Sequence, residues 1–323
     1  MSGAPIPAPG AHGGDAAAVA AWLGVARSAV LDLSQTLNPW AADPRPVIAR
    51  HLDAVRDYPD DGPATDVLAA ALGMPADRVL LTNGAAEAIA IVAAELGPGW
   101  AEPDEFSLYR RHLHLHDRPG RRGLDEAGPR WRANPHNPRG TLAGPGSGAD
   151  VWDEAFWPMS TGTWTRGDAD RGAIVIGSLT KLLAVAGLRI GYILCSTAAM
   201  RARLEHRRPR WSVNGLVCAA LPELLDTVDL VHTARAVAAG RVDLAEVLSA
   251  HGLAVVPSVA PWLLVTGDAD LRTRLARQAV VVRDCTSFAM PGTFRIAVPD
   301  AHGLGRLDEA LRVTSAPVDG VPS

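Results

Sequence analysis

The sequence of 323 residues contains almost no lysine. Lys181 is the only one, and arginine supplies the rest of its 31 basic residues. Arginine can replace lysine wherever only a positive charge is needed, but it does not deprotonate near neutral pH to give a nucleophilic amine. A retained lysine therefore indicates a covalent role, because a lysine amine forms Schiff bases with carbonyl compounds. The alternative is a lysine that has survived by chance on the surface of a helix.

Cysteine, long apolar runs and excess charge are also scarce. Cys195, Cys218 and Cys285 are too widely spaced for a disulfide framework or a metal motif. No apolar run reaches the length of a membrane span, and a formal net charge of −4 argues against a nucleic-acid surface. The N-terminus lacks the basic segment of a signal peptide. We therefore expect a cytoplasmic protein whose ligand is a small molecule, with no nucleic acid, membrane or metal partner.

The lysine lies in a motif, Ser-x-x-Lys followed by Gly-Leu-Arg-x-Gly-Tyr. This motif resembles the cofactor-lysine segment of the class I/II aminotransferases, which are fold-type I enzymes that use pyridoxal 5'-phosphate (PLP). The resemblance implies that Lys181 binds PLP as a Schiff base. It also implies that Ser178 and Arg189 hold the cofactor phosphate, with Thr180 as a second hydroxyl. The apolar run 173–176 predicts a buried strand that places the lysine at its carboxyl end, where ligands of open α/β sheets bind.

A strand, a glycine turn and an alanine-rich helix are predicted over residues 79–89. The first N–H groups of such a helix attract a phosphate, and small side chains let the backbone approach it. In the family this turn binds the PLP phosphate, which implies that role for Gly84, Ala85 and Ala86. A Tyr-Pro pair of the family reaches the phosphate of a partner subunit. By resemblance Tyr58 does so here, in a homodimer with a shared active site, unless it is an ordinary turn tyrosine.

Two further motifs of the family concern the cofactor ring. The pattern Phe-x-x-Tyr begins at Phe106, and the resemblance implies that this ring stacks on the pyridine. The pattern Asn-Pro-x-Asn-Pro-x-Gly contains Asn137, which by resemblance hydrogen-bonds the phenolic oxygen of the cofactor. The alternative for Phe106 is an ordinary core or surface position.

The segment Val-x-Asp-Glu-Ala-Phe resembles the family's ring-nitrogen motif. By resemblance Asp153 pairs with the pyridinium nitrogen and keeps the ring an electron sink. A carboxylate at the end of a buried strand is costly without a partner, which favours this role over a helix-capping aspartate. Phe156 stands where many aminotransferases have a tyrosine that contacts the phenolic oxygen. Phenylalanine here resembles the threonine-phosphate decarboxylase branch.

Two positions are expected to bind substrate. Asn38 ends the pattern Asp-x-Ser-x-x-x-Asn-Pro, which lines the substrate pocket in histidinol-phosphate aminotransferases and threonine-phosphate decarboxylases. Arg295 lies in the predicted strand 294–298, where the family has an arginine that grips the substrate carboxylate through a bidentate pair. The alternative for Arg295 is a structural strand arginine.

The resemblance implies transamination of a small phosphorylated amino acid or amine of the histidinol-phosphate kind. The second reading is decarboxylation of threonine phosphate in cobalamin biosynthesis. A third reading, of a different class, is a PLP-fold binding protein without catalysis. Retention of the only lysine, Lys181, argues against it.

The expected fold is α/β: a large PLP-binding domain with a mostly parallel, seven-stranded type of sheet, and a small α+β domain from both chain ends. We expect a disordered N-terminus over 1–15, the large domain over 46–225, and the small domain over 16–45 and 226–323. Few residues separate Gly140 from Asp153, where the family has a helix, so the large domain is expected to be trimmed. Its sheet would then lack an element.

The segment 110–133 is rich in arginine and histidine. His112, His114 and His116 alternate, so on a strand they would share one face. A metal site there is one reading, but no carboxylate or cysteine is spaced to complete it. We favour a solvated segment near the phosphate end of a substrate. The remaining expected elements are helices at 16–26, 64–72, 200–207, 237–251 and 270–279, and strands at 253–259, 262–265 and 280–282.

Overall fold

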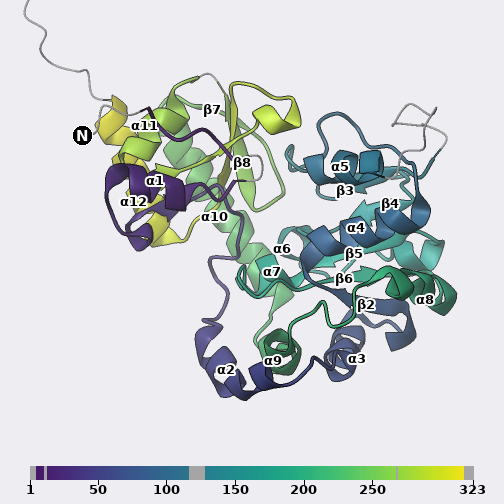
Figure 1. Cartoon of the computed structure of the whole chain (residues 1–323). Coiled ribbons are helices and arrows are strands. Elements are labelled where there is room, and N and C mark those ends of the chain that lie inside the picture. Colours follow the sequence, from purple (N-terminus) through teal and green to yellow (C-terminus); the bar gives the residue numbers. More distant parts are fainter. Residues whose placement is uncertain (1–4, 11–12, 116–127, 267, 316–323) are drawn as a thin grey trace, which may run out of the picture. The chain divides into compact units, whose positions relative to one another are not determined.

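The computed structural model describes residues 5–10, 13–115, 128–266 and 268–315 (Figure 1). Contacts within the chain define two compact units, one of residues 37–237 and one of residues 1–36 with 238–323. The units divide after residues 36 and 237, rather than after 45 and 225 as the sequence suggested. No helix of the described residues is long and apolar enough to cross a membrane.

The larger unit is built on one mixed sheet. Its strands are β2 (Val79–Thr82), β3 (Trp131–Ala133), β4 (Val151–Asp153), β5 (Ile174–Ser178) and β6 (Gly191–Leu194). Their order is β2-β6-β5-β4-β3, with β6 antiparallel to both neighbours and β3, β4 and β5 mutually parallel. Four strands thus share one direction. Among the described residues this sheet has five strands rather than the expected seven.

The connection from β3 to β4 contains no helix. Residues 141–150, between β3 and β4, form turns and irregular chain. A parallel connection usually needs a dozen or more residues and a helix. This one has no helix with which to cover another strand. A single parallel bridge between Trp100 and Arg130 continues the edge beyond β3.

Helices cover both the sheet and its edges. α4 packs on β5 and β6, with α5 and α8 beside it, and α3 packs on β2 and α9. The buried positions of α4 include Ala88, Ile89, Val92 and Ala93, which repeat at helical spacing and form one apolar face. The helices of this unit are α2 (Arg45–Arg50), α3 (Gly62–Leu72), α4 (Gly84–Leu96), α5 (Ser107–Leu115), α6 (Trp157–Thr161), α7 (Leu179–Leu182), α8 (Ala198–Arg207) and α9 (Gly215–Asp226).

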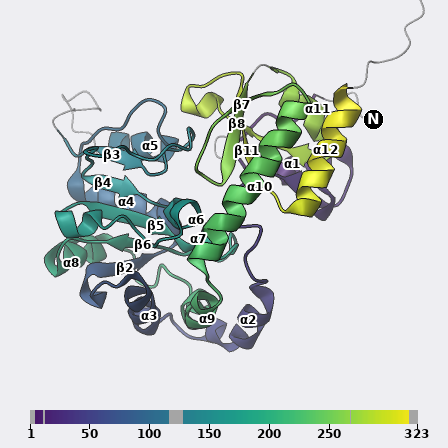
Figure 2. The ribbon, with the colours of Figure 1, turned by 180° about the vertical axis from the view of Figure 1, so that it is seen from behind.

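The smaller unit is an α+β unit. Its four-stranded antiparallel sheet has the order β10-β11-β8-β7, and β1 pairs with β9 in parallel. The strands are β1 (Leu31–Asp32), β7 (Ala254–Val256), β8 (Trp262–Thr266), β9 (Val280–Val281), β10 (Arg283–Asp284) and β11 (Thr293–Ala297). The helices are α1 (Ala16–Leu23), α11 (Leu271–Arg277) and α12 (Ala301–Ser315). The long α10 (Leu230–Ala250) contains the boundary between the units (Figure 2).

Part of the N-terminal segment 1–15, which was expected to be disordered, makes defined contacts. Among the residues described there, Pro7 O accepts from Arg272 Nη2 at 2.7 Å, and Gly10 O accepts from Arg283 Nη1 at 2.7 Å. Ile6 packs against the apolar cluster beside α1. Arg272 and Arg283 are buried, and buried guanidinium groups need acceptors. These carbonyls supply them, which orders residues 5–10.

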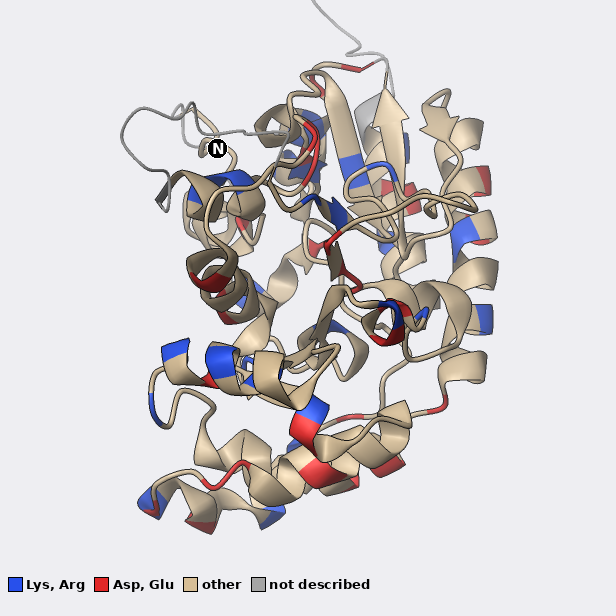
Figure 3. Cartoon of the chain, turned by 90° about the vertical axis from the view of Figure 1, so that its right-hand side faces the viewer, with Lys and Arg blue, Asp and Glu red and all other residues tan. Residues whose placement is uncertain are grey.

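The arginine- and histidine-rich segment also differs from expectation. Its residues up to 115 belong to α5, a helix rather than a strand, so alternate residues such as His112 and His114 do not share a face. His116 and residues 117–127 lie outside the described residues. No group of three or more metal-ligating side chains occurs in the described part of the chain. Acidic and basic residues are interspersed along the helices and loops (Figure 3).

Candidate active site

Lys181 lies in a short, tightly fixed turn. β5 ends at Ser178 and α7 follows at once, so Lys181 Nζ reaches back to the Ser178 hydroxyl at 3.4 Å. The same Nζ lies 5.0 Å from the centroid of the Phe156 ring, which is itself 7% exposed. Thr180 donates its hydroxyl hydrogen to Ile190 O at 3.0 Å and accepts from Ile190 N at 3.1 Å. These bonds fix the turn to the start of β6. A phosphate contact from Thr180 stays a prediction, and it would need the hydroxyl to rotate away from Ile190.

Asn38 holds the same turn from another side. Its backbone N–H donates to Lys181 O at 2.9 Å, and its side-chain amide donates to Leu182 O at 3.1 Å. Its own side-chain oxygen accepts from Trp40 N at 3.0 Å. No sequence pattern indicated this supporting role. Substrate binding by Asn38 stays a prediction.

The turn before α4 forms a cradle of backbone and guanidinium groups. Gly84 has φ of 74°, which favours glycine, and a Cβ there would lie 2.6 Å from Arg189 Nη2. A Cβ on Gly191 would lie 2.6 Å from Ala85 N. The Asn83 side chain makes no capping hydrogen bond at this helix start, so it does not occupy the first N–H groups, which could bind a phosphate. Of the predicted phosphate ligands, the structure brings together Gly84, Ala85 and Arg189.

Asp153 ends β4 as a buried carboxylate that is 9% exposed. It accepts from the Tyr109 hydroxyl at 2.7 Å and from Ala155 N at 2.9 Å. Burial raises the pKa of Asp153 above its ordinary value, whereas Tyr109, Ala155 and the charge of Lys181 lower it. The lysine and this carboxylate are therefore near enough to interact. This role of Tyr109 was not predicted from the sequence, although Tyr109 is the last residue of the Phe-x-x-Tyr pattern.

The other ring-binding residues lie near these. The Phe106 ring meets the Tyr109 ring edge-on, with centroids 5.7 Å apart, and packs against the core beneath α4. Asn137 is 8% exposed in the loop after β3. Stacking by Phe106 and hydrogen bonding by Asn137 stay predictions.

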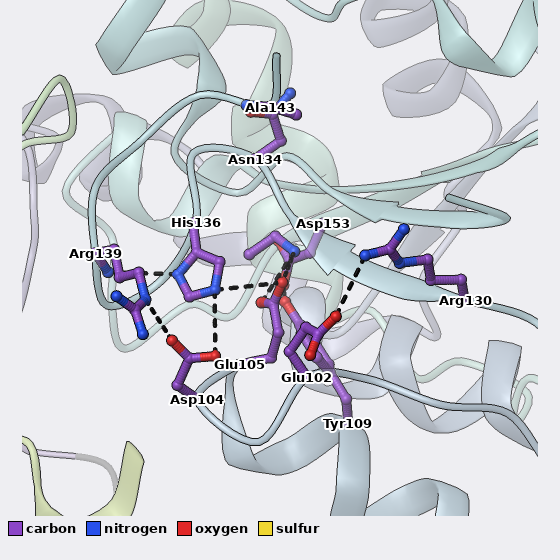
Figure 4. Close-up of polar contacts among 11 residues, drawn as sticks. Glu102, Asp104, Glu105, Tyr109, Arg130, Asn134, His136, Arg139, Ala143 and Asp153 are labelled. Atoms are coloured by element: carbon purple, nitrogen blue, oxygen red, sulfur yellow. Dashed lines mark hydrogen bonds and ion pairs between the residues drawn. The ribbon is translucent and has the colours of Figure 1, made fainter. Parts of the chain in front are cut away.

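A second layer of polar groups lies behind Asp153 (Figure 4). Glu105 is 1% exposed and accepts from Ala133 N at 3.1 Å. His136 Nε2 lies 3.7 Å from Glu105 Oε1 and 3.8 Å from Asp104 Oδ1. These contacts were not predicted from the sequence either. Asp104 and Glu105 directly precede the Phe-x-x-Tyr pattern. His136 is the first variable residue of the pattern Asn-Pro-x-Asn-Pro-x-Gly, in the loop that contains Asn137 (the asparagine loop).

Tyr58 and Arg295 are placed differently from the residues above. Tyr58 is 79% exposed on the larger unit and stacks on Trp211, with ring centroids 4.5 Å apart. Arg295 belongs to β11 of the smaller unit, with its guanidinium 4.9 Å from the Trp262 ring and Nη2 3.5 Å from Ser34 O. Burial lowers the pKa of Arg295 to about 10. The roles of both residues stay predictions.

The groups of the larger unit fit PLP. The Lys181 amine suits the aldehyde of the cofactor. The start of α4, together with the Arg189 guanidinium, suits its phosphate, and the buried Asp153 carboxylate suits its pyridinium nitrogen. A Cβ at position 84 or 191 would fill the cradle. The fold and this set of residues define a fold-type I PLP-dependent enzyme.

Comparison with known proteins agrees. Residues 131–313 match the family model of aminotransferase class I and II. The chain therefore belongs to the class I and II aminotransferases, which use PLP.

Relatives cover nearly the whole chain. A threonine-phosphate decarboxylase of Salmonella typhimurium is 29% identical, with 94% of this chain and 96% of the relative covered. A histidinol-phosphate aminotransferase of Symbiobacterium thermophilum is also 29% identical, with 88% and 90% covered. The structure of a histidinol-phosphate aminotransferase from Sinorhizobium meliloti in complex with PLP has a TM-score of 0.75 at 18% identity. It covers 93% of this chain and 94% of that one. At that identity the likeness concerns the fold.

Proposed function

We propose that the chain transaminates a small phosphorylated amino acid or amine of the histidinol-phosphate kind. The observation that carries the proposal is the placement of Lys181 Nζ beside Ser178 and the Phe156 ring, within electrostatic reach of buried Asp153. Histidinol-phosphate aminotransferases recur among the relatives that match most of this chain. PLP, when bound, supplies an electron-poor ring that stabilises negative charge at the substrate Cα.

Each residue of the site then has a distinct task. Lys181 would bind the cofactor aldehyde and, once displaced by the substrate amine, move the proton at Cα as general acid and base. Asp153, held by Tyr109, would keep the ring nitrogen protonated. Arg189, Ser178 and the start of α4 would hold the phosphate.

Covalent attachment is the first test of these assignments. Borohydride reduction of the wild-type protein with PLP should leave a cofactor-modified peptide that contains Lys181, detected by mass spectrometry. The variant Lys181→Ala should show no such peptide while keeping its circular dichroism spectrum. A modified peptide elsewhere in the chain, or none in the wild type, would contradict the assignment.

A second candidate function is decarboxylation of threonine phosphate. The observation that favours it is Phe156, 7% exposed beside Lys181, at a position where many aminotransferases have a tyrosine. The bond broken is the one held perpendicular to the ring, so the orientation of the carboxylate decides the reaction. Transamination requires the Cα–H bond in that position, and decarboxylation requires the Cα–carboxylate bond.

One assay separates the two reactions. The PLP-loaded protein is given phosphorylated amino acids and amines, with and without 2-oxoglutarate, and both glutamate and carbon dioxide are measured. Glutamate formed from histidinol phosphate supports the first proposal. Carbon dioxide from threonine phosphate without glutamate would replace it by the second. Arg295→Ala should abolish the exchange with glutamate if that guanidinium binds the carboxylate.

We also propose a homodimer in which Tyr58 serves the active site of the partner. Several exposed apolar side chains on the larger unit support a dimer interface that includes Tyr58. They are Leu52 at 54%, Val55 at 66%, Tyr58 at 79% and Trp211 at 57% exposed. Isolated exposed apolar residues are ordinary, whereas a group of them often marks an interface.

Mixed dimers test the shared site. Lys181→Ala and Tyr58→Ala are each expected to be inactive or weak alone. If Tyr58 acts across the interface, a mixed dimer contains one site with both residues intact, and mixing the variants restores activity. If Tyr58 acts within its own subunit, every site lacks one residue, and mixing restores nothing. A monomer in sedimentation with PLP bound would also refute the proposal.

We propose a cytoplasmic location. The three cysteines are free, buried thiols. Persistent free thiols suit a reducing compartment.

A further inference from the structure

Glu105 is a buried carboxylate one strand away from Asp153 (Figure 4). It is 1% exposed, and both of its oxygens lie near Ala133 N, at 3.1 and 3.3 Å. Ala133 is the direct partner of Asp153 in the parallel pair of β3 and β4. Two buried carboxyl groups, Glu105 and Asp153, therefore lie at the same paired position of β3 and β4.

Two nearby arginines pair with other carboxylates, and Arg132 lies with its guanidinium 5.5 Å from the centroid of the Trp152 ring. Arg139 pairs with Asp104, and Arg130 pairs with Glu102 at 3.3 Å. In the part of the chain that the structure describes, the only ion-pair partner of Glu105 is His136, at 3.7 Å. A buried carboxylate is rarely ionised without a close cation.

His136 is the neutral form of the imidazole in this arrangement. Its Nδ1 accepts from the backbone N–H of Arg139 at 3.4 Å, so Nδ1 carries no hydrogen and Nε2 carries one. A protonated ring would direct an N–H group at another N–H group. Burial also lowers the pKa of His136. The imidazole therefore does not neutralise a negative charge on Glu105.

We propose that Glu105 is a positioning residue that carries a proton at neutral pH, so that Asp153 meets the cofactor ring without a second buried negative charge beside it. Burial, together with the charges of Asp153 and Asp104, raises the pKa of Glu105 to about 8, whereas Ala133 N–H and the charge of Arg132 oppose this. This deepens the assignment of Asp153 to the ring nitrogen and depends on it.

The proposal has a consequence for the bound cofactor. Above pH of about 8 Glu105 loses its proton and adds a negative charge near Asp153. Nearby like charges raise the proton affinity of a site, so both Asp153 and the ring nitrogen should hold a proton more tightly. The visible absorbance of the bound cofactor should therefore titrate with an additional step near that pH.

Infrared difference spectra test the proton directly and need no cofactor. The carbonyl stretch of a protonated carboxyl group is recorded for the apoprotein as the pH is raised. In the difference between wild type and Glu105→Gln, we expect one band that disappears with a midpoint near pH 8. Glu102→Gln is the matched control, because Glu102 is 45% exposed and pairs with Arg130. It should leave the band unchanged. Absence of a Glu105-dependent band would overturn the proposal.

A second variant serves if Glu105→Gln does not fold. Asp104→Asn removes a charge that raises the pKa of Glu105 and releases Arg139 from its pair. Both changes favour the ionised form, so the band should disappear at lower pH than in the wild type. An unchanged or raised midpoint would contradict the proposal.

The last test measures the visible absorbance of the PLP-bound protein as the pH is raised. The additional absorbance step should be present in the wild type and in Glu102→Gln, and absent in Glu105→Gln. An infrared band without any absorbance step in the wild type would overturn the proposal, because the proton would then not affect Asp153. If Lys181 binds no cofactor at all, the proposed function fails, and the infrared arm still decides the protonation of Glu105.

Discussion

Two glycines of the lysine motif lie four residues apart, and the structure gives them opposite roles. A Cβ on Gly191 would lie 2.6 Å from both Ala85 N and Gly84 C, and 3.0 Å from Gly177 O. These are backbone atoms of α4 and β5, which cannot move aside like the end of a side chain. A Cβ on Gly187 would meet nothing within 4 Å. The substitutions Gly191→Ala and Gly187→Ala therefore add the same methyl group, but only the methyl group at position 191 would clash with the backbone.

We expect Gly191→Ala to lower the free energy of unfolding by about 1–3 kcal/mol, the usual cost of overpacking a core. The start of α4 must also move away from β6, which separates its N–H groups from Arg189. If this movement lowers the binding free energy of PLP by about 1.4 kcal/mol, the dissociation constant rises about tenfold.

Urea unfolding of the apoprotein and equilibrium binding of PLP measure the two effects. Gly187→Ala should change the unfolding free energy by no more than about 0.5 kcal/mol, as surface substitutions do. Equal behaviour of the two variants in both assays would refute the packing of β6 against the start of α4.

Three further outcomes are expected. Tyr109→Phe removes the hydrogen bond to Asp153, worth about 1.5–3 kcal/mol for a charged acceptor, so the PLP dissociation constant should rise about tenfold or more. Tyr192→Phe changes another buried tyrosine, on β6, and should leave the constant unchanged. Equal constants for all three proteins would exclude the role of Tyr109. Lys181→Arg keeps the charge but should give no borohydride-stable cofactor adduct, and an adduct would show that another group is the nucleophile. Burial raises the pKa of Glu154 to about 7 from 4.5, so its stabilising contribution is present at low pH and is lost as the pH rises between these values. Denaturation at several pH values should therefore show the wild type losing up to about 3 kcal/mol relative to Glu154→Gln across that range, and parallel curves would contradict the shift.

The regular elements and the site motifs could largely be predicted from the sequence. The strand Val79–Thr82 was predicted with its observed bounds, because four apolar or β-branched residues precede a glycine turn. β5 and α8 differ from their predicted ranges by one or two residues at an end. Periodicity and turn residues determine such elements locally.

The supporting layer could not be predicted in this way. Three acids occur within four residues before α5, and nothing in their order indicates that Glu105 is buried while Glu102 pairs with Arg130 in solvent. That distinction depends on β3, which lies far along the chain and supplies Ala133 N–H. The order of residues 5–10 likewise depends on two buried arginines more than 250 residues away. Long-range hydrogen bonds of this kind leave no local pattern.

The trimmed sheet bears on function because of where the reduction falls. β4, β5 and β6 carry or position Asp153, Ser178 and the Lys181 turn, and they are all present and fully buried. The short connection lies at the β3 edge, where β3 is followed by the asparagine loop and anchors Glu105. At that edge Glu105 accepts from Ala133 N at 3.1 Å, a donor that a further strand could have used. Asn134 N instead extends the pairing with β4 by donating to Asp153 O, and its side-chain oxygen accepts from Ala143 N at 3.0 Å. The residues that hold the edge are thus the same ones that surround Asp153, so a change there should alter the ring-nitrogen site before it alters the lysine turn.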